Sequence, residues 1–247
     1  MIDYLYDGSF EGLLTCIYYN YHREQAAGIY EEKSYQSSMF NGFKVILTRE
    51  DKADIVYKAI AEKISHYDLR RLYRVYRSSD PGKDMAILDY VRIGFKKGKD
   101  VSSLHGDPAV FRIQRIEGKV SNEIHRLKGL IRFSLLGNQV LYSPIEPDHD
   151  ILEFLGPHFS DRFAKEPFLI HDLSRKKALA SAGGKWYIAR MTVDRIPAKD
   201  EEEAVYQRLW RDYFRTIAIK ERANPKCQKS FMPVRYWKHL TEMKEEM

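Results

Sequence analysis

The segment from residue 123 to residue 186 constrains the fold most, because it holds the clearest strand and turn pattern in the chain. Apolar and polar residues alternate from Leu130 to Leu136, which predicts a strand with one buried face. Gly137-Asn138 follows at a position where a two-residue hairpin turn needs positive φ, and Gln139–Ser143 predicts the returning strand. The segment therefore begins with a β-hairpin.

The register of this hairpin divides its side chains between two faces. A two-residue turn places Leu135 opposite Val140, and it places Phe133 opposite Tyr142 on the same face. The other face is polar and carries Arg132, Ser134, Gln139 and Ser143. This division predicts a sheet whose apolar face is covered by helices.

A helix and three more strands are predicted after the hairpin. Asp150 and Glu153 have the spacing of a capping box, and Gly156-Pro157 interrupts the helix that they begin. Asp148 is an alternative cap. The later strands are predicted over Phe168–His171, Lys177–Ala182 and Lys185–Val193, with a hairpin turn at Gly183-Gly184. The order is therefore β-β-α-β-β-β.

A long helix is predicted after the last strand. The acidic residues from Asp200 to Glu203 suit the first turn of a helix, where the helix dipole favours negative charge. The apolar residues that are expected to form its buried side are Val205, Leu209, Trp210, Phe214 and Ile217. Asn224-Pro225 ends this helix, and a short terminal helix is predicted to begin near Pro233.

Helical periodicity dominates the chain before residue 129. Strands are predicted around Tyr4 and over Phe43–Leu47, with a helix capped by Ser9 and an irregular connection over residues 22–42 between them. Further helices are predicted after Thr48, around Leu72, around Leu88 and after Asp107-Pro108.

These elements predict an α+β fold. A mostly helical N-terminal lobe, residues 1–128, is expected to pack with a mixed or antiparallel sheet and C-terminal helices in residues 129–247. No Gly/Ser-rich or charge-block linker separates the lobes. Residues 1–247 are therefore predicted to form a single unit.

Charge and cysteine content restrict the classes of function. The formal net charge of +6 favours a polyanionic partner such as nucleic acid. The two cysteines, Cys16 and Cys227, are too far apart for a CxxC motif and suggest a reducing compartment. The early acidic residues argue against a secretory signal, and no apolar run approaches the roughly 20 residues that a membrane helix needs. We therefore expect a cytoplasmic protein without membrane contact.

Two rows of cationic residues recur at helical spacing in the first half of the chain. Lysine and arginine side chains that neutralise phosphates release counterions, so such rows favour nucleic-acid binding. The residues predicted to contact phosphates are Arg70, Arg74, Arg77, Arg112, Arg115 and Lys119, with Arg132 extending the track. The alternative is that these rows are solvated helix faces.

The tail NPKCQKSFMPVRYWKHL interleaves cations with aromatic residues. This mixture suits phosphate contact combined with base stacking. The residues assigned to that role are Lys226, Lys229, Arg235, Tyr236, Trp237 and Lys238. The alternative is that Tyr236 and Trp237 anchor the terminal helix.

Two His-Asp pairs are the candidates for catalysis. His149-Asp150 and His171-Asp172 invite comparison with metal-dependent phosphohydrolases, with the histidines as proton carriers and the carboxylates activating water. Asp7 is a further candidate, at a strand-to-helix corner. The alternatives are helix capping by Asp150, and turn formation by Asp7 and Asp172. The spacing of the histidines matches no strong zinc pattern, so no metal and no cofactor is predicted.

Four segments resemble a bacterial protein family. They are DGSFEGLLTCIY, EIHRLKGLIRF, PDHDILEFLGPHFSDRF with the following IHD, and NPKCQKSFMPVRYWKHL. The family consists of DNA metabolism or repair proteins described as a domain of unknown function. Its members look like proteins that are encoded beside a radical SAM protein similar to spore photoproduct lyase. In other bacteria, a similar domain is fused to a uracil-DNA-glycosylase-like domain.

This resemblance implies a DNA repair or modification context but no known reaction. The chain lacks the three closely spaced cysteines of a radical SAM cluster, so it is not expected to be a radical SAM enzyme itself. The resemblance implies a radical SAM protein as its partner. The preferred function is therefore a DNA-binding accessory protein. The alternatives are a hydrolase or glycosylase-like enzyme that acts on DNA bases or nucleotides through the His-Asp pairs, and a protein-interaction module without DNA contact.

Overall fold

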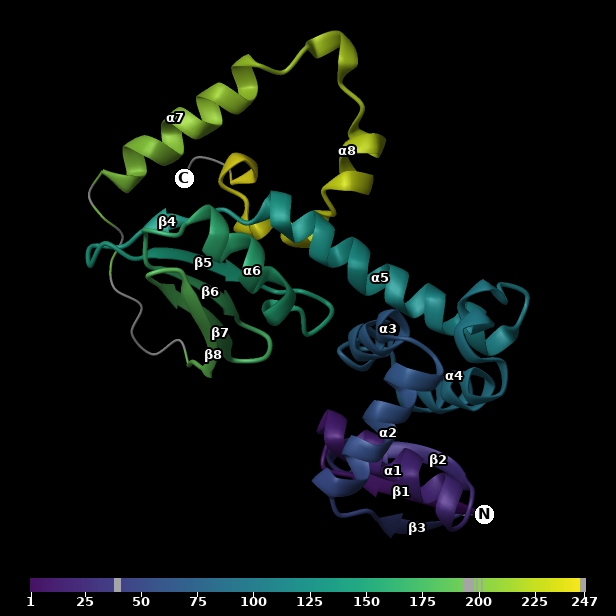
Figure 1. The fold of residues 1–247 in the computed structure, drawn as a ribbon. Coiled ribbons are helices and arrows are strands. Elements are labelled where there is room, and N and C mark those ends of the chain that lie inside the picture. The colour runs from purple at the N-terminus through teal and green to yellow at the C-terminus, as the bar shows by residue number, and fades with distance from the viewer. Residues whose placement is uncertain (38–40, 193–197, 199, 201, 245–247) are drawn as a thin grey trace. The chain divides into compact units, whose positions relative to one another are not determined.

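The computed structural model describes all residues except 38–40, 193–197, 199, 201 and 245–247. The described residues form an α+β protein, as predicted. They divide into two compact units, residues 1–121 and 122–247, and the boundary falls within the long helix α5 (Pro108–Leu130; Figure 1). None of the described helices is both long and apolar enough to cross a membrane.

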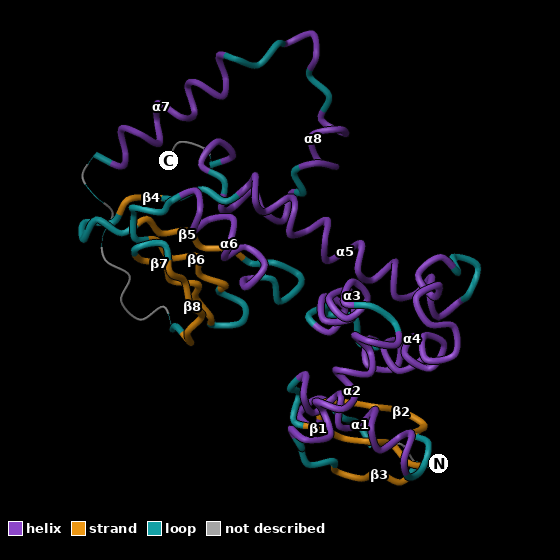
Figure 2. Tube along the Cα trace, in the orientation of Figure 1, coloured by secondary structure: helices purple, strands orange, loops and turns teal. Residues whose placement is uncertain are grey.

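The first unit combines helices with a small parallel sheet, whose strands are orange in Figure 2. Its strand order is β2-β1-β3, and both pairings are parallel. The strands are β1 (Ile2–Tyr6), β2 (Ala26–Glu31) and β3 (Gly42–Val45). The helices are α1 (Phe10–His22), α2 (Glu50–Lys63), α3 (His66–Tyr76), α4 (Lys83–Lys97) and the first part of α5, with short 3-10 turns at Glu32–Ser34 and Gly98–Ser103.

Strand β2 corrects the expectation of an irregular connection over residues 22–42. Its sequence, AAGIYE, lacks the alternation of a half-buried strand. It is held instead by parallel pairing with β1 and by the Asn20 side chain, whose Oδ1 accepts a hydrogen bond from the Ala26 N–H at 3.0 Å. Ser9 caps α1 as predicted, because its side chain accepts a hydrogen bond from the Gly12 N–H.

The second unit contains a mixed sheet in the order β4-β5-β6-β7-β8. The strands are β4 (Ser134–Leu135), β5 (Leu141–Ile145), β6 (Phe168–Asp172), β7 (Lys177–Ala182) and β8 (Lys185–Arg190). Only the β5–β6 pair is parallel, and α6 (Leu152–Arg162) makes the crossover that such a pair requires. The predicted order β-β-α-β-β-β is therefore confirmed.

Helical segments complete the second unit. They are α7 (Glu203–Thr216), a 3-10 turn at Lys220–Arg222, α8 (Pro225–Phe231), and the 3-10 helices η4 (Val234–His239) and η5 (Thr241–Met243). The predicted helix start in the acidic run is confirmed at Glu203, and residue 201 lies outside the described residues. The predicted end at Asn224-Pro225 is wrong, because α7 ends at Thr216 and these two residues begin α8. The predicted extension of the last strand to Val193 also lies outside the described residues.

The predicted register of the first hairpin is wrong by one residue. Ser134 pairs with Tyr142, and Leu135 pairs with Leu141. The turn is longer than two residues, because Gln139 rather than Gly137 has the positive φ, at 62°, and its N–H donates to the Leu136 carbonyl at 2.8 Å. A turn that ends in a left-handed residue is the usual form of a three-residue hairpin loop. The second hairpin is as predicted, with φ of 58° and 73° at its two turn glycines.

The predicted capping box of α6 is also wrong. The helix begins at Leu152, and its N-cap Ile151 makes no side-chain cap hydrogen bond. The Asp150 carboxylate instead accepts a hydrogen bond from Lys177 Nζ at 2.7 Å, an ion pair that outweighs the local cap. Pro157 lies inside the helix rather than ending it, so only one backbone hydrogen bond is lost at that turn.

Gly156 allows α6 to approach β8 closely. A Cβ at this position would lie 2.6 Å from the Trp186 ring, which is closer than any real contact. We therefore expect Gly156→Ala to lower the free energy of unfolding of the second unit by about 1–3 kcal/mol, the usual cost of overpacking. Urea unfolding followed by tryptophan fluorescence measures this change.

The matched control is Gly129→Ala, because a Cβ at Gly129 would meet no atom within 4 Å. An alanine there removes only the helix cost of glycine, so the protein is expected to be unchanged or up to about 1 kcal/mol more stable. Equal destabilisation by both substitutions would contradict a specific contact between Gly156 and Trp186.

Candidate nucleic-acid interface

The predicted basic row on α3 is partly neutralised. Arg74 forms an ion pair with Glu117 of α5 at 3.2 Å. The Arg77 guanidinium lies 5.4 Å from the centre of the Tyr73 ring, in a cation–π contact. Arg70 is exposed and has no ionic or hydrogen-bonding partner among the described residues. Of this row, Arg70 is therefore the residue best able to meet a phosphate.

The predicted row on α5 is more open. Arg112 donates a hydrogen bond to the Gly82 carbonyl at 3.1 Å, which ties the start of α4 to α5. Arg115 and Lys119 are exposed, and the described part of the chain offers neither of them a salt bridge. The first unit thus presents three unpaired cations out of the six that the sequence indicated.

The C-terminal tail is anchored largely by its own predicted DNA-binding residues. Tyr236 is buried, and Arg235 pairs with Asp148 at 2.8 Å. Lys238 pairs with Glu146, and Trp237 donates from its indole to the Met232 carbonyl at 2.8 Å. These contacts match the alternative that the tail packs on the protein. Lys226 and Lys229, on α8, are exposed and make no ion pair within the described residues.

Glu123 is the acceptor that fixes this tail. Its side chain is only 3% exposed and lies on the C-terminal part of α5. It accepts hydrogen bonds from the backbone N–H groups of Asp148 and His149, both at 2.8 Å, and from the Tyr236 hydroxyl. Burial and the bond to Glu123 together raise the pKa of Tyr236. One buried carboxylate therefore connects α5, the loop before α6 and the tail.

The His-Asp pairs lie close to one another but are engaged in structural contacts. Asp172 is fully buried, and its carboxylate accepts hydrogen bonds from the Arg175 N–H and guanidinium at 3.1 and 2.9 Å. The same guanidinium donates to the Asp148 carbonyl, next to His149. Asp150 is held by Lys177, the strand partner of Asp172. Each carboxylate is thus paired with a cationic side chain.

The histidines of these pairs are not exposed to solvent. His171 is fully buried, and its Nδ1 lies 3.0 Å from the Tyr142 hydroxyl. His149 is 9% exposed, and its backbone is bound by Glu123. Within the described residues, no group of three or more His, Cys, Asp or Glu side chains could hold a metal ion.

Asp7 belongs to the first unit and orders the turn before α1. Its carboxylate accepts hydrogen bonds from the Ser9 N–H and hydroxyl at 2.9 and 2.6 Å, and from the Thr48 hydroxyl at 2.9 Å. Burial opposes ionisation, but these hydrogen bonds outweigh it and lower the pKa of Asp7. This geometry is that of an ionised turn residue, in agreement with the turn alternative.

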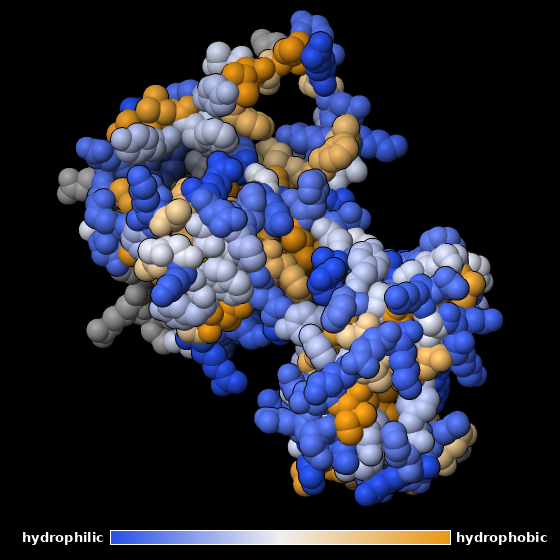
Figure 3. All heavy atoms as spheres, in the orientation of Figure 1, coloured by the Kyte–Doolittle hydropathy of each residue, from blue (hydrophilic) through white to orange (hydrophobic). Residues whose placement is uncertain are grey.

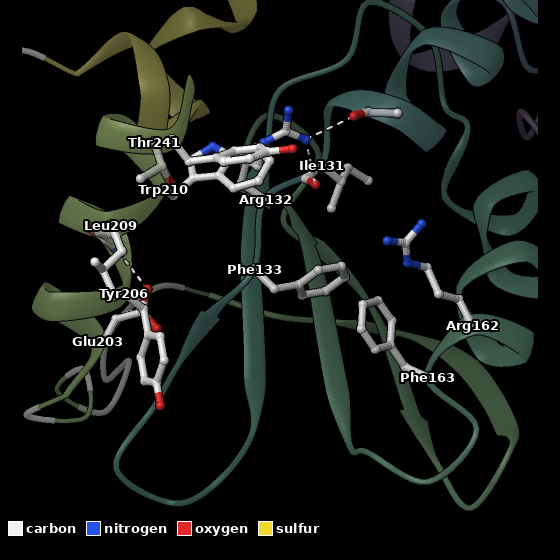
Figure 4. A pocket seen from close by; sticks show the side chains of 13 residues that line it. Ile131, Arg132, Phe133, Arg162, Phe163, Glu203, Tyr206, Leu209, Trp210 and Thr241 are labelled. Atoms are coloured by element: carbon white, nitrogen blue, oxygen red, sulfur yellow. Dashed lines mark hydrogen bonds between the residues drawn. The ribbon is translucent and has the colours of Figure 1, made fainter. Parts of the chain in front are cut away.

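A pocket of the second unit was not anticipated from the sequence (Figure 4). Its cavity volume is about 770 Å³, within the range of small-molecule sites. Phe133 and Phe163 lie on one side of it, whereas Tyr206, Leu209 and Trp210 of α7 lie on the other. Arg132, Arg162 and Glu203 supply charged groups at its edges.

Phe133 is held in a fixed position by other aromatic rings. Its ring centre lies 5.6 Å from that of Phe159, 5.0 Å from that of Phe163 and 5.8 Å from that of Phe168, all in edge-to-face geometry. Such pairs add about 0.5–1.5 kcal/mol each beyond the area that they bury. This side of the pocket is therefore a preformed aromatic wall.

Trp210 on the opposite side is held by a buried ion pair. Glu242, whose side chain is 1% exposed, accepts two hydrogen bonds from Arg132 at 2.7 and 3.2 Å and one from the Trp210 indole at 2.9 Å. The Arg132 guanidinium also lies 5.4 Å from the centre of the Trp210 ring. Arg132, one of the predicted phosphate contacts, thus positions an aromatic ring of the pocket.

Glu203 fixes the start of α7 against the sheet. It is 7% exposed and accepts hydrogen bonds from the Leu135 N–H at 2.9 Å and from the Gln207 amide at 2.6 Å. Gln207 also donates to the Ser134 hydroxyl at 3.1 Å. The amide donors of Gln207 are therefore directed at the protein.

Four of the five apolar residues predicted to be the buried side of α7 are exposed, and the fifth, Phe214, is half-buried, which corrects that prediction. The exposed fractions are 47% for Val205, 56% for Leu209, 38% for Trp210 and 55% for Ile217. Apolar side chains accordingly appear on the surface along α7 and the segment after it (Figure 3). An apolar helical stripe indicates burial only where a neighbouring element covers it.

The outer face of α7 is basic. Arg208 and Arg215 are exposed on the side of the helix opposite to its pocket residues, and neither has an ion-pair partner among the described residues. From Ala204 to Leu240 the sequence contains nine Lys or Arg residues but only two Asp or Glu residues. The positive charge of the chain is therefore concentrated in this segment.

Sequence reasoning missed Arg162, Arg208 and Arg215, and it treated Trp210 as core. For Arg208, Trp210 and Arg215, the signal that could have found them is the composition of residues 204–215, where aromatic and arginine residues replace the aliphatic residues of an ordinary core helix. Base-stacking surfaces use this combination.

The comparisons with known proteins give a family but no activity. Residues 81–242 match DUF4130, a domain of unknown function. No curated protein sequence matched the chain. Among solved structures, a pGpG-specific phosphodiesterase, PggH from Vibrio cholerae, is similar with 7% identity and a TM-score of 0.36 over 79% of this chain and 84% of that chain. The DUF4130 match covers more than half of the sequence and confirms that the chain resembles a domain of unknown function. The protein therefore belongs to the DUF4130 family.

Proposed function

We propose that this protein is a DNA-binding accessory protein of DNA repair or modification. The partner expected from the family resemblance is a radical SAM protein similar to spore photoproduct lyase. The observation that carries the DNA-binding proposal is the exposed basic surface of the C-terminal segment. On α7 and α8, four exposed cations lack an ion-pair partner in the described structure, and we call them the C-terminal basic residues: Arg208, Arg215, Lys226 and Lys229.

Electrostatics explain why these residues favour DNA. An unpaired, solvated cation can neutralise a phosphate and release its counterion without first breaking an ion pair. Arg74, Arg235 and Lys238 would each have to leave a carboxylate before they could contact DNA. The proposed phosphate contacts are therefore the C-terminal basic residues, with Arg70, Arg115 and Lys119 as contacts from the first unit.

The test is fluorescence anisotropy with plain DNA at low salt. Alanine at all four C-terminal basic residues is expected to weaken binding at least about 100-fold. Each substitution removes one phosphate contact, and such contacts contribute to the affinity for any DNA sequence. The matched control removes four exposed lysines of the first unit, Lys58, Lys96, Lys97 and Lys99, and changes the net charge equally. Its affinity is expected to fall less than tenfold. An equal loss of DNA affinity in both variants would show that only the total charge matters, and it would contradict a specific role of the C-terminal basic residues.

The hydrolase alternative is separated in the same assay. DNA binding that survives Asp150→Ala and Asp172→Asn, without turnover in the unmodified protein, supports the accessory role. Metal-dependent or base-releasing turnover that these substitutions abolish would instead support the enzyme. Co-purification with the radical SAM protein, in the presence and absence of DNA, tests the expected partner.

A further inference from the structure

We infer that the pocket between the Phe133–Phe163 wall and α7 receives one unstacked base of single-stranded DNA. This inference rests on the proposed function, since it takes DNA as the ligand, and it adds the strand state that the protein selects. The residues that carry it are Phe133, Phe163, Tyr206, Trp210 and Arg162.

The pocket has aromatic surfaces on two sides. The rings of Phe133 and Phe163 lie on one side, and those of Tyr206 and Trp210 lie on the other. The two walls are held by independent contacts, the phenylalanine cluster and the Glu242 carboxylate. A planar base is the natural ligand for such walls, because every base offers a π-face to an aromatic ring.

The exposure of the α7 rings points to a ligand rather than to a core. Tyr206 is 60% exposed and Tyr213 is 55% exposed, although both line the cavity. Tyrosine and tryptophan combine a large stacking surface with a polar group and are typical of binding surfaces. A base inserted beside them would cover this aromatic area.

Charge favours a nucleotide over an apolar peptide. Arg162 is exposed at the edge of the pocket, and the described residues provide it with no carboxylate partner. Burial lowers the pKa of His158 on the same helix, the nearby cations Lys128 and Arg162 lower it further, and Asp161 raises it. The one acid of the pocket, Glu203, is already occupied by Leu135 and Gln207.

Two polar residues that line the pocket, Gln207 and Thr241, can contact the edge of a nucleobase. The Gln207 carbonyl oxygen accepts no hydrogen bond in the described structure, because only the amide nitrogen of this side chain is engaged. Thr241, which carries a hydroxyl, also lines the cavity. The amide oxygen accepts hydrogen bonds and a hydroxyl both donates and accepts them, so together the two residues suit several bases without strong sequence preference.

A base that is stacked in duplex DNA cannot enter such a pocket. Extrusion from a duplex costs a few kcal/mol, whereas a base in a single strand is already accessible. The pocket should therefore raise affinity for single-stranded DNA selectively, whereas the C-terminal basic residues, on the other face of α7 and on α8, act on both forms.

The experiment compares single-stranded and duplex oligonucleotides of equal length by anisotropy. The pocket variant is Tyr206→Ala with Tyr213→Ala, two exposed residues whose loss spares the Arg132–Glu242 pair. We expect its affinity for single-stranded DNA to fall about tenfold or more while duplex affinity stays within about twofold. The control variant is Tyr187→Ala, an equally exposed tyrosine of the same unit outside the pocket.

An abasic site gives an independent measurement. A single abasic position in a short oligonucleotide is expected to weaken binding to the unmodified protein and to have no effect on the pocket variant. A pocket variant that loses single-stranded and duplex affinity equally, or that still senses the abasic site, overturns the base pocket while DNA binding stands. Absence of any DNA binding by the unmodified protein at low salt overturns the proposed function itself, and the inference with it.

Discussion

Glu123→Ala is expected to lower the free energy of unfolding of the second unit by about 3–5 kcal/mol. The substitution removes a buried carboxylate that three donors share, and it leaves the N–H groups of Asp148 and His149 and the Tyr236 hydroxyl without their acceptor. Each buried donor left unsatisfied costs about 1–3 kcal/mol. We also expect the tail to lose its anchor, because Arg235 and Tyr236 both contact this carboxylate.

Tryptophan fluorescence during urea unfolding measures this effect on the correct part of the chain. All three tryptophans, Trp186, Trp210 and Trp237, belong to residues 122–247. Glu166→Ala removes an exposed glutamate of the same unit and is expected to change stability by less than about 0.5 kcal/mol. A Glu123→Ala protein as stable as this control would show that the carboxylate does not hold the tail.

Arg132→Ala is expected to cost about 3–5 kcal/mol, because it leaves the Glu242 carboxylate buried without its cation. The substitution should also loosen Trp210, which the same carboxylate positions. The matched control is the double variant Arg132→Met with Glu242→Met, which replaces both charges by apolar side chains. This variant is expected to lose less stability than Arg132→Ala, since no unpaired charge remains.

The contribution of this pair depends on pH. Burial alone would raise the pKa of Glu242, but hydrogen bonds from Arg132 and Trp210 outweigh burial and hold the pKa below its usual range. A lowered pKa in the folded state means that the stabilisation is complete above the unfolded value of about 4.3 and is lost as pH falls through the folded value. Below about pH 4, the unmodified protein should therefore lose more stability than the double methionine variant, which has no ion pair to lose. A pH-independent difference would show that the pair is not ionised in the folded protein.

Local signals in the sequence predicted much of the fold. Gly183-Gly184 fixed the second hairpin because both residues need positive φ, and Ser9 marked the start of α1. The order of elements in the second unit follows from the same turn and periodicity signals. These features depend on residues that are neighbours in the sequence, so local sequence patterns are enough to predict them.

Features that depend on distant residues could not be predicted in this way. The register of the first hairpin was missed for a local reason, because Gln139 in its turn adopts a positive φ that its residue type does not favour. Arg74 is neutralised by Glu117, 43 positions away, and Tyr236 is buried against Glu123, 113 positions away. A basic or aromatic pattern shows that residues share a face but not which acid or ring covers that face.

The same limit explains how the candidate site was missed. The apolar stripe of α7 predicted burial, yet these residues form one wall of an open pocket whose other wall comes from Phe133 and Phe163. The pocket combines four separate segments of the chain, residues 129–133, 162–163, 203–213 and 241. No local pattern brings these segments together.

The salt dependence of DNA binding tests the central claim most directly. The observed affinity of the unmodified protein for plain duplex DNA should fall steeply with salt, with a log–log slope of about −0.9 for each phosphate neutralised. Alanine at the four C-terminal basic residues should make this slope shallower by about four. A slope near zero for the unmodified protein, or the same slope for the unmodified protein and the alanine variant, would contradict the claim that these residues bind the DNA backbone.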